Sequence, residues 1–213
     1  MTSLIASSTY IWRKINRPVA VVRIEGEFHH LLRSQIRQQL SPVVVEKFFS
    51  IKLSQIKKTL RVLPWVHDVT IKRQWPDQLL VKIYERIPQA RWNNRWLIDQ
   101  SGNIFIPDNL RNFNHLPALS GVITQENEMW KTFLFLKKRL QTISLTITDF
   151  STDDIDNWCF VTNGVKISVG EHNHYKRIEA FILLYKQQLK GQWSNIDSVD
   201  LRYTNGIAIA WKK

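Results

Sequence analysis

The chain has 213 residues, of which 44% are hydrophobic and 23% charged, a composition typical of a globular protein with one or two domains. Its single cysteine, Cys159, excludes an intramolecular disulfide. The formal net charge of +12 suits nucleic acid, an anionic membrane or an acidic polymer as a partner. Because Lys and Arg are spread along the whole sequence, a generally solvated basic surface is favoured over a nucleic-acid interface.

The first residues form an uncharged, partly apolar stretch, Met1–Trp12, which Arg13, Lys14 and Arg17 follow. A spanning helix needs ~20 apolar residues, so this stretch is too short to cross a bilayer alone. It also lacks the positive leading region of a signal peptide. Two interpretations stay open. The stretch is the last half of a membrane helix, with Trp12 at the interface and the three basic residues beyond it, or it is a tail outside the fold.

A strand and two helices follow. Residues 18–26 are rich in β-branched residues and end in glycine, which predicts a strand. Two short helices are then predicted from apolar residues at helical spacing, the second of them with Ser50 as its N-cap. The apolar stripes are Leu32, Ile36 and Leu40 in the first helix, and Leu53, Ile56, Leu60 and Leu63 in the second.

The second helix is predicted to end at Leu63, because Pro64 disfavours helical backbone in the residue before it. Apolar residues then alternate with polar ones on both sides of Pro76-Asp77, the pattern of a hairpin with its turn at that dipeptide. The order β-α-α-β-β allows two helices to cover one face of a three-stranded sheet. We therefore predict a first domain over residues 18–87, after a segment over residues 1–17.

Residues 88–213 are predicted to form a second, β-rich domain with two helices packed on its sheet, which makes the fold class α+β. Strands are expected near residues 91–99, 104–106 and 145–150, with a loop over 109–121 between them. The helices are expected over 125–140 and over 174–189, the second one stopped by Gly191. Asn163-Gly164 predicts a tight hairpin, because both central residues of a type I′ turn need positive φ.

A second Asn-Gly pair, Asn205-Gly206, predicts a closing hairpin between strands 199–203 and 207–211. In the last strand Ile207, Ile209 and Trp211 alternate with the small Ala208 and Ala210. If this strand lies at a sheet edge, its backbone groups are able to pair with a strand from a partner. The other possibility is that the strand lies inside the sheet.

No pattern in the sequence supports catalysis or a cofactor. The two close histidine pairs, His29-His30 and His172/His174, lack the further ligands that a metal centre needs. The acidic residues around Asp154 lack the glycine and closing glutamate of a calcium loop. Neither a phosphate-binding loop nor a nucleophile elbow is present. We therefore predict a protein that is not an enzyme, and we expect its tryptophans chiefly to pack the sheets rather than to stack on bases.

Several motifs follow one another in a fixed order along the chain. They are Leu-Pro-Trp-Val at 63–66, Lys-Arg-Gln-Trp-Pro-Asp at 72–77, Arg-Ile-Pro-Gln-Ala-Arg-Trp at 86–92, Leu-Ile-Asp at 97–99, Leu-Pro-Ala-Leu at 116–119 and the closing hairpin at 199–211. Together these motifs resemble the FtsQ/DivIB family of bacterial cell-division proteins, and the resemblance covers about Pro18 to Trp211.

The resemblance implies a POTRA domain followed by a β domain, in a single-pass inner-membrane protein with its bulk in the periplasm at the division septum. It implies a scaffold without catalytic activity that joins early and late division proteins. The implied partners are FtsB and FtsL, with FtsK and FtsW as further division proteins, and no nucleic acid. In the family FtsB adds a strand to the end of the β domain. The matching positions are Arg202, Tyr203, Thr204, Asn205, Gly206, Ile207, Ala208, Ile209, Ala210 and Trp211, with Tyr203 and Trp211 as anchors.

The resemblance also implies a complete spanning helix before the POTRA domain, of which only Met1–Trp12 remains in this sequence. Either the chain is truncated there or its start has been placed inside the membrane segment. The main alternative is a POTRA-containing component of protein transport or outer-membrane assembly. The sequence lacks the long run of alternating strands that a following barrel needs, which argues against that alternative.

Overall fold

The computed structural model describes residues 16–213. Trp12, Arg13 and Lys14, three of the four predicted membrane-flanking residues, lie outside the described residues. The chain divides into two compact units, Met1–Arg86 and Ile87–Lys213, and each is described by itself. Together they confirm the predicted α+β class.

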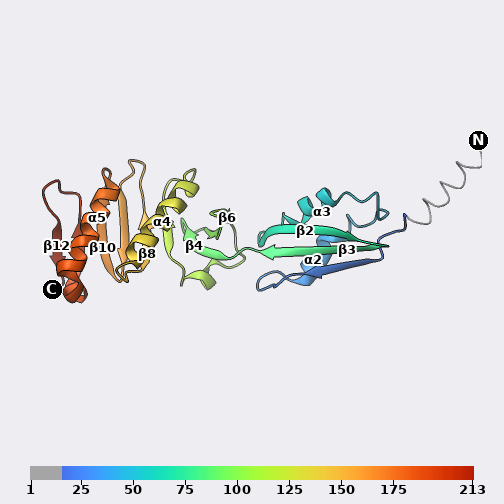
Figure 1. Ribbon diagram of the computed structural model, residues 1–213, viewed down its shortest axis with the longest axis horizontal. Helices are drawn as coiled ribbons and strands as arrows, with labels where there is room; N and C mark the ends of the chain where they lie inside the picture. Colours follow the sequence, from blue (N-terminus) through green and yellow to red (C-terminus); the bar gives the residue numbers. More distant parts are fainter. Residues whose placement is uncertain (1–15) are drawn as a thin grey trace, which may run out of the picture. The chain divides into compact units, whose positions relative to one another are not determined.

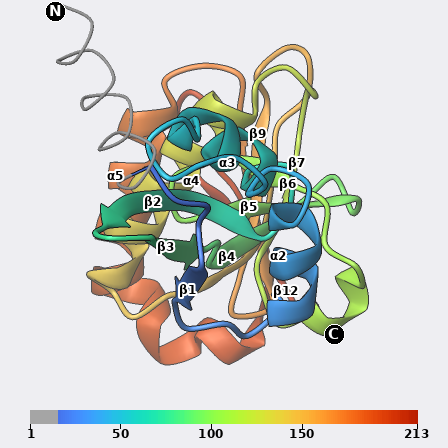
Figure 2. The ribbon, with the colours of Figure 1, turned by 90° about the vertical axis from the view of Figure 1, so that its right-hand side faces the viewer.

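The first unit has the predicted β-α-α-β-β order (Figure 1). Its three-stranded sheet has the order β1-β3-β2, in which β1 pairs with β3 in parallel and β2 with β3 antiparallel. Figure 2 shows both helices on the same side of this sheet. The elements are β1 (Val21–Glu25), α2 (Arg33–Leu40), α3 (Leu53–Leu60), β2 (Val66–Gln74) and β3 (Gln78–Glu85).

The alternating apolar residues of β2 and β3 form much of the core of this unit. Val69, Leu79, Val81 and Ile83, on the face toward the helices, are at most 1% exposed, as the period of two requires. They pack against α2 and α3, whose buried side chains are at most 4% exposed. Leu32, predicted in the first apolar stripe, instead precedes α2 and is 62% exposed. The core consists mainly of Ile36, Leu40, Ile56, Leu60, Val69, Leu79, Val81 and Ile83.

Two predicted details of α3 are wrong. The helix begins at Leu53, with Lys52 rather than Ser50 as its N-cap. The Ser50 hydroxyl instead accepts a hydrogen bond from the Asn16 side chain at 3.3 Å, so a long-range contact uses the side chain that the local pattern assigned to capping. The helix also ends at Leu60, three residues before the predicted end, and turns connect it to β2.

The second unit is a nine-stranded sheet in the order β12-β11-β10-β9-β8-β7-β4-β5-β6, with α4 and α5 on one face (Figure 1). Its strands are β4 (Pro88–Trp92), β5 (Trp96–Asp99), β6 (Ile104–Phe105), β7 (Ala118–Ser120), β8 (Ile147–Ser151), β9 (Trp158–Thr162), β10 (Val165–Gly170), β11 (Ile196–Asp200) and β12 (Ala208–Trp211). The helices are α4 (Glu126–Gln141) and α5 (His174–Leu184). A single apolar core lies between the helices and the sheet.

Local signals predicted much of this unit. Asn163 and Gly164 have positive φ and join β9 to β10, as predicted. By contrast, the predicted loop over residues 109–121 contains β7, which joins β4 to β8 through parallel pairing on both sides. Three residues are too few for a periodic signal, and the neighbours of β7 are far away in the sequence.

The second helix of this unit also ends differently. A regular α-helix stops at Leu184, and a π-turn (Tyr185–Leu189) and a 3-10 segment (Lys190–Asn195) follow it. Gly191 lies inside the 3-10 segment and does not stop the helix. The wider turn keeps Tyr185 and Leu189 buried, and Tyr185 contacts the ring of Trp193 at 5.0 Å. Aromatic packing therefore sets the backbone here.

An exposed ion-pair cluster ties α3 to β2. Asp68 accepts from Lys57 at 3.0 Å and from Arg61 at 2.7 Å, and these two bonds hold the pKa of its carboxyl well below the ordinary value. Because the folded-state pKa is lowered, this stabilisation is present above the unfolded pKa, near 4, and is lost as the pH falls below it.

We therefore expect Asp68→Asn to lower the free energy of unfolding at pH 7 by about 1 kcal/mol, since exposed pairs contribute little each. The difference from the parent chain should shrink steadily below about pH 4. Urea unfolding at a series of pH values measures it. Glu128→Gln, which breaks only the exposed pair with Lys131, is the control. A difference that is constant with pH would contradict the assignment.

Candidate partner-binding edge

β12 is the terminal strand of the nine-stranded sheet and has β11 as its one neighbour. It pairs antiparallel, with Asp200 opposite Ala208 and Val199 opposite Ile209. β12 lies at the end of the sheet next to the C-terminus (Figure 1). One side of its backbone therefore has no strand beside it in the part of the chain that the structure describes.

Hydrogen bonds at the ends of the pair show which residues of β12 face outward. The Lys212 N–H donates to the carbonyl of Asn195, on the β11 side, at 2.8 Å. Successive residues of an antiparallel strand point their backbone groups to opposite sides. Ala208 and Ala210 therefore face β11, and Ile209 and Trp211 present their N–H and C=O groups to the open side.

The other side of β11 gives the same assignment. The Leu201 N–H donates to the carbonyl of Ser168, in β10, at 2.8 Å. By the same alternation Val199 faces β10, whereas Asp200 and Ser198 face β12. These are the two residues opposite Ala208 and Ala210. The register shift in this pair lies between Ile196 and Ser198 of β11, so it does not change the alternation within β12.

The side chains of β12 differ between its two faces. Ile209, together with Ile207 before the strand, is partly buried against the core. Ala208 and Ala210 are exposed and point to the other face. Two exposed aromatic side chains lie here: Tyr203, in the connection before the strand, is 62% exposed, and Trp211, the last residue of the strand, is 49% exposed. A strand placed beside β12 would meet apolar groups on one face and small groups on the other.

The predicted tight hairpin is not formed, because residues 201–207 make a longer connection between β11 and β12. Arg202, Tyr203, Thr204, Asn205, Gly206 and Ile207 thus lie in a loop, and of the ten predicted site residues only the last four are in the strand. Residues 203–208 line a shallow hollow of about 420 Å³. The Asn-Gly signal marks the bend correctly but not its length.

Side-chain bonds shape this loop at its start. The Arg202 guanidinium donates to both oxygens of Asp200 at 2.6–3.0 Å, and the Arg202 N–H donates to Asp200 Oδ1 at 3.0 Å. These bonds lower the pKa of the Asp200 carboxyl and raise that of Arg202. β11 ends at Asp200, the acceptor of this pair, and the connection to β12 begins directly after it.

Arg177 of α5 fixes the loop from the other side. Its guanidinium donates to the carbonyl of Val169 at 2.6 Å and to that of Arg202 at 3.0 Å. Gly170 makes this approach possible: its φ is +89°, and a Cβ there would lie 2.5 Å from Arg177 Nη1. The sequence did not single out Arg177, since one basic residue in an amphipathic helix carries no distinctive signal.

The histidines and acidic residues considered for metal binding have structural contacts. The His174 ring stacks on Trp158 at 3.9 Å, and its Nε2 lies 2.9 Å from the carbonyl oxygens of Asp156 and Gly170. Asp153 accepts a hydrogen bond from the backbone N–H of Asn157. This bond is the chief cause of the lowered pKa of the Asp153 carboxyl. Within residues 16–213 no group of three or more potential ligands comes together.

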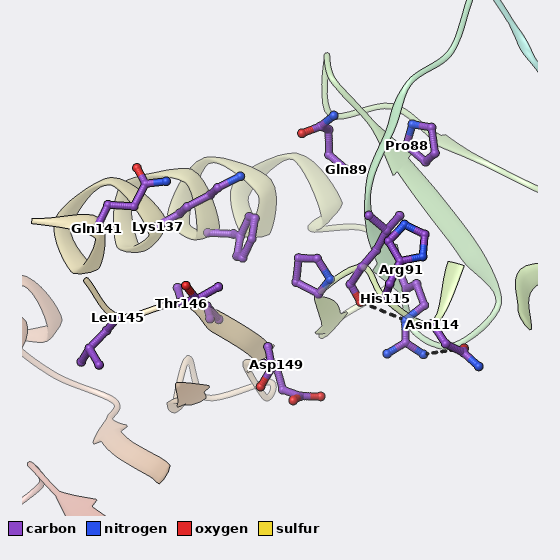
Figure 3. Close-up of a pocket in the computed structure, with 15 residues that line it drawn as sticks. Pro88, Gln89, Arg91, Asn114, His115, Lys137, Gln141, Leu145, Thr146 and Asp149 are labelled. Carbon is purple, nitrogen blue, oxygen red and sulfur yellow. Dashed lines mark hydrogen bonds between the residues drawn. The ribbon is translucent and has the colours of Figure 1, made fainter. Parts of the chain in front are cut away.

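A second concavity of about 490 Å³ lies between α4, β4 and β8 (Figure 3). The Arg91 guanidinium lines it and donates to the carbonyl of Leu116 and, at 3.4 Å, to Asn114. Lys137 and Gln141 of α4 lie across the opening from Arg91. Because β7 is only three residues long, the loop before it leaves the sheet and a hollow remains. Arg91 holds this loop through its two hydrogen bonds.

Arg17 is the one predicted membrane-flanking residue within the described structure. Its side chain is exposed, and its carbonyl accepts from the Phe48 N–H at 2.8 Å. No helix in residues 16–213 is both long enough and apolar enough to span a bilayer.

Two family models match this chain. One, described as cell division protein FtsQ/DivIB, C-terminal, matches residues 90–202, more than half of the chain. The other, POTRA domain, FtsQ-type, matches residues 17–86. The chain belongs to the FtsQ/DivIB family. The resemblance seen in the sequence is thus confirmed, and the FtsQ-type POTRA match speaks against the transport alternative.

Curated relatives agree with this assignment. Cell division protein FtsQ of Hahella chejuensis is 32% identical over 93% of this chain and 71% of its own length. FtsQ of Coxiella burnetii is 31% identical over 99% of the chain and 87% of its length. FtsQ of Escherichia coli K12 is 29% identical over 91% and 73%. The FtsQ family is thus a family of cell-division proteins.

The Arg177 contacts predict a positioning role for this side chain. We expect Arg177→Met to speed hydrogen exchange in residues 202–207 by tenfold or more, because the loop loses a charge-assisted bond of about 1.5–3 kcal/mol. The core strands β9 and β10 should keep their protection. Lys176→Met, at an exposed neighbour, is the matched control. Equal exchange in the two variants would show that Arg177 does not hold the loop.

Proposed function

We propose that this FtsQ-family protein is a non-enzymatic scaffold of the bacterial divisome that holds FtsB and FtsL through the open edge of β12. In that role it links early to late division proteins at the septum, with FtsK and FtsW as further partners. We place the bulk of the chain in the periplasm and its N-terminal segment, with Trp12, Arg13, Lys14 and Arg17, at the inner membrane. Membership of the family supports each of these assignments.

The observation that carries the proposal is the outward direction of the backbone groups of Ile209 and Trp211. An extended segment beside β12 would bond to them as a tenth strand. Each such bond contributes about 0.5–1.5 kcal/mol net, so backbone pairing alone gives modest affinity. The exposed rings of Tyr203 and Trp211 supply the aromatic anchors that usually dominate such interfaces.

The exposed face of β12 supports the same geometry. Ala208 and Ala210 leave room for large side chains of an added strand on the face without helices. On the other face, Ile207 and Ile209 extend the apolar core to the edge. An added strand would therefore bury more apolar surface on the helix-covered face, which favours one register over the register shifted by one residue.

Hydrogen exchange tests the edge directly. With a soluble FtsB–FtsL segment bound, we expect the amides of Ile209 and Trp211 to gain strong protection, because only these two N–H groups of β12 face outward. Those of Ala208 and Ala210, already paired with β11, should change less. Binding without new protection in β12 would mean that the partner docks elsewhere.

Proline substitution separates backbone pairing from side-chain contact. We expect Trp211→Pro to weaken FtsB–FtsL binding about tenfold more than Trp211→Ala, because both variants remove the ring and only proline removes the outward N–H. Calorimetry measures the affinities, and thermal unfolding of the free variants should agree within a few degrees.

Ala210→Pro is the contrasting variant. Its N–H faces β11, so it should lower thermal stability where Trp211→Pro does not. Equal affinities for Trp211→Pro and Trp211→Ala would contradict strand addition while leaving a side-chain contact possible.

A further inference from the structure

The end of the first unit at which the described chain begins is built from three segments. The Phe48 N–H donates to the Arg17 carbonyl at 2.8 Å, and the Phe49 N–H donates to Asn16 Oδ1 at 3.0 Å. The Ala20 N–H donates to the Asp77 carbonyl in the β2–β3 turn at 2.8 Å. Residues 16–21, residues 45–52 and the hairpin tip at 72–77 thus meet. We call the exposed face of these segments the basal surface.

Polar contacts make this surface rigid. Arg73 donates from Nε to the Phe48 carbonyl at 3.0 Å and from Nη2 to the Ile51 carbonyl at 2.7 Å, which ties the hairpin tip to the loop before α3. Asn16 is only 6% exposed and bonds to both Phe49 and Ser50. The backbone of the basal surface is therefore preorganised for contact.

Large apolar side chains of the basal surface are left in water. Trp75 at the hairpin tip is 73% exposed, Val45 is 78% exposed and Phe49 is 39% exposed. Five of the other tryptophans are at most 9% exposed, namely Trp65, Trp92, Trp130, Trp158 and Trp193. Trp75 therefore departs from the packing role that the sequence predicted for most tryptophans. An indole at a projecting turn suits a boundary between an apolar phase and water.

Basic groups surround these apolar side chains. Arg17, Lys47, Lys52, Lys72 and Arg73 all have exposed side chains in the three segments. The acidic residues of the same segments are Glu46 and Asp77, so five cations stand against two anions. Each basic residue near an anionic membrane strengthens binding by roughly fivefold.

We infer that the basal surface rests on the anionic phospholipid surface of a bilayer, with the Trp75 ring at headgroup depth. An exposed indole and aliphatic groups ringed by lysine and arginine match this partner in polarity and charge. In the sequence, the uncharged stretch Met1–Trp12 and the basic residues Arg13 and Lys14 lie shortly before Asn16, the first residue of this surface. The inference does not depend on the role proposed for β12.

A polarity-sensitive fluorophore tests this contact in the full 213-residue chain. It is attached to a single cysteine in a Cys159→Ser background, either by Gln74→Cys at the hairpin tip or by Leu32→Cys. Leu32 is 62% exposed and lies at the other end of the unit, where Glu85 Oε1 accepts from the Leu31 N–H. β3 separates the two ends by eight residues, roughly 26 Å.

We expect vesicles of mixed phosphatidylcholine and phosphatidylglycerol to shift the emission of the label at position 74 to the blue and to leave the label at 32 unchanged. Raising the salt concentration should reverse the shift, because the attraction is screened. A shift at both positions, at neither, or equally with pure phosphatidylcholine would overturn the inference. A blue-shifted label at 74 without vesicles would mean that residues 1–15 cover the surface. The same shift with single-stranded DNA would assign the surface to nucleic acid.

Charge reversal provides the quantitative test. Lys47→Glu with Lys52→Glu should raise the vesicle concentration needed for half of the shift by roughly tenfold or more. Lys137→Glu with Lys138→Glu, at exposed sites on α4 of the second unit, changes the net charge equally and should have little effect. Trp75→Ser should weaken the shift without changing its dependence on salt. Equal effects of the two double variants would reduce the contact to overall charge and refute a specific surface.

Discussion

Every backbone N–H and C=O group of a strand needs a partner, and within residues 16–213 β12 has a neighbouring strand on one side only. Its four residues are bonded to β11 through Ala208 and Ala210, so the groups of Ile209 and Trp211 depend on water or on another chain. This constraint gives the second unit a preformed surface for an extended segment. The pairing with β11 already fixes the direction and register of this edge.

An open edge invites indiscriminate pairing, and several features limit it. The strand is short, Lys212 and Lys213 follow it at once, and residues 201–207 close off its start. Arg177 and the Arg202–Asp200 pair hold that connection. These bonds lengthen the connection between β11 and β12. They thus limit the open edge to the few residues of β12 and place Tyr203 next to that strand. Only a segment that matches both the short edge and its aromatic flanks gains the full interaction.

The sequence predicted those features that local patterns determine. Alternation predicted β2 and β3 and their buried face, helical spacing predicted α2 and α4, and Asn163-Gly164 predicted the turn between β9 and β10. Features that depend on distant neighbours were missed. β7 forms because β4 and β8 lie on either side of it, Ser50 bonds to Asn16 instead of capping α3, and the π-turn at Tyr185 follows from packing against Trp193. The partners of β7 and Ser50 are far away in the sequence, whereas Trp193 lies eight residues after Tyr185 and beyond the end of the predicted helix.

In the candidate site, too, features set by local patterns were predicted and features that depend on distant residues were missed. The alternation of isoleucine and alanine indicated the last strand, and its position at the edge follows from sheet order, which no local pattern contains. Arg177 lies 25 residues before the carbonyl that it binds. A binding site on a strand edge consists largely of backbone groups, which every residue has. Its small side chains, Ala208 and Ala210, therefore give little sequence signal for binding. The residues that shape the surroundings of the edge, such as Arg177, are the informative ones.

Charge at the edge has a role distinct from that of the backbone. The Arg202 charge is largely neutralised by Asp200, and Lys212 Nζ donates to the Ser194 carbonyl at 2.9 Å but keeps its charge. Lys213 adds a second cation at the end of the strand. These cations lie at the rim, where electrostatics chiefly speeds association. Pairing with Ile209 and Trp211 and burial of the flanking rings instead determine how slowly a partner leaves. Salt should therefore slow the association of a strand-adding partner more than it speeds its release, and this kinetic difference separates a specific edge from general attraction to a basic protein.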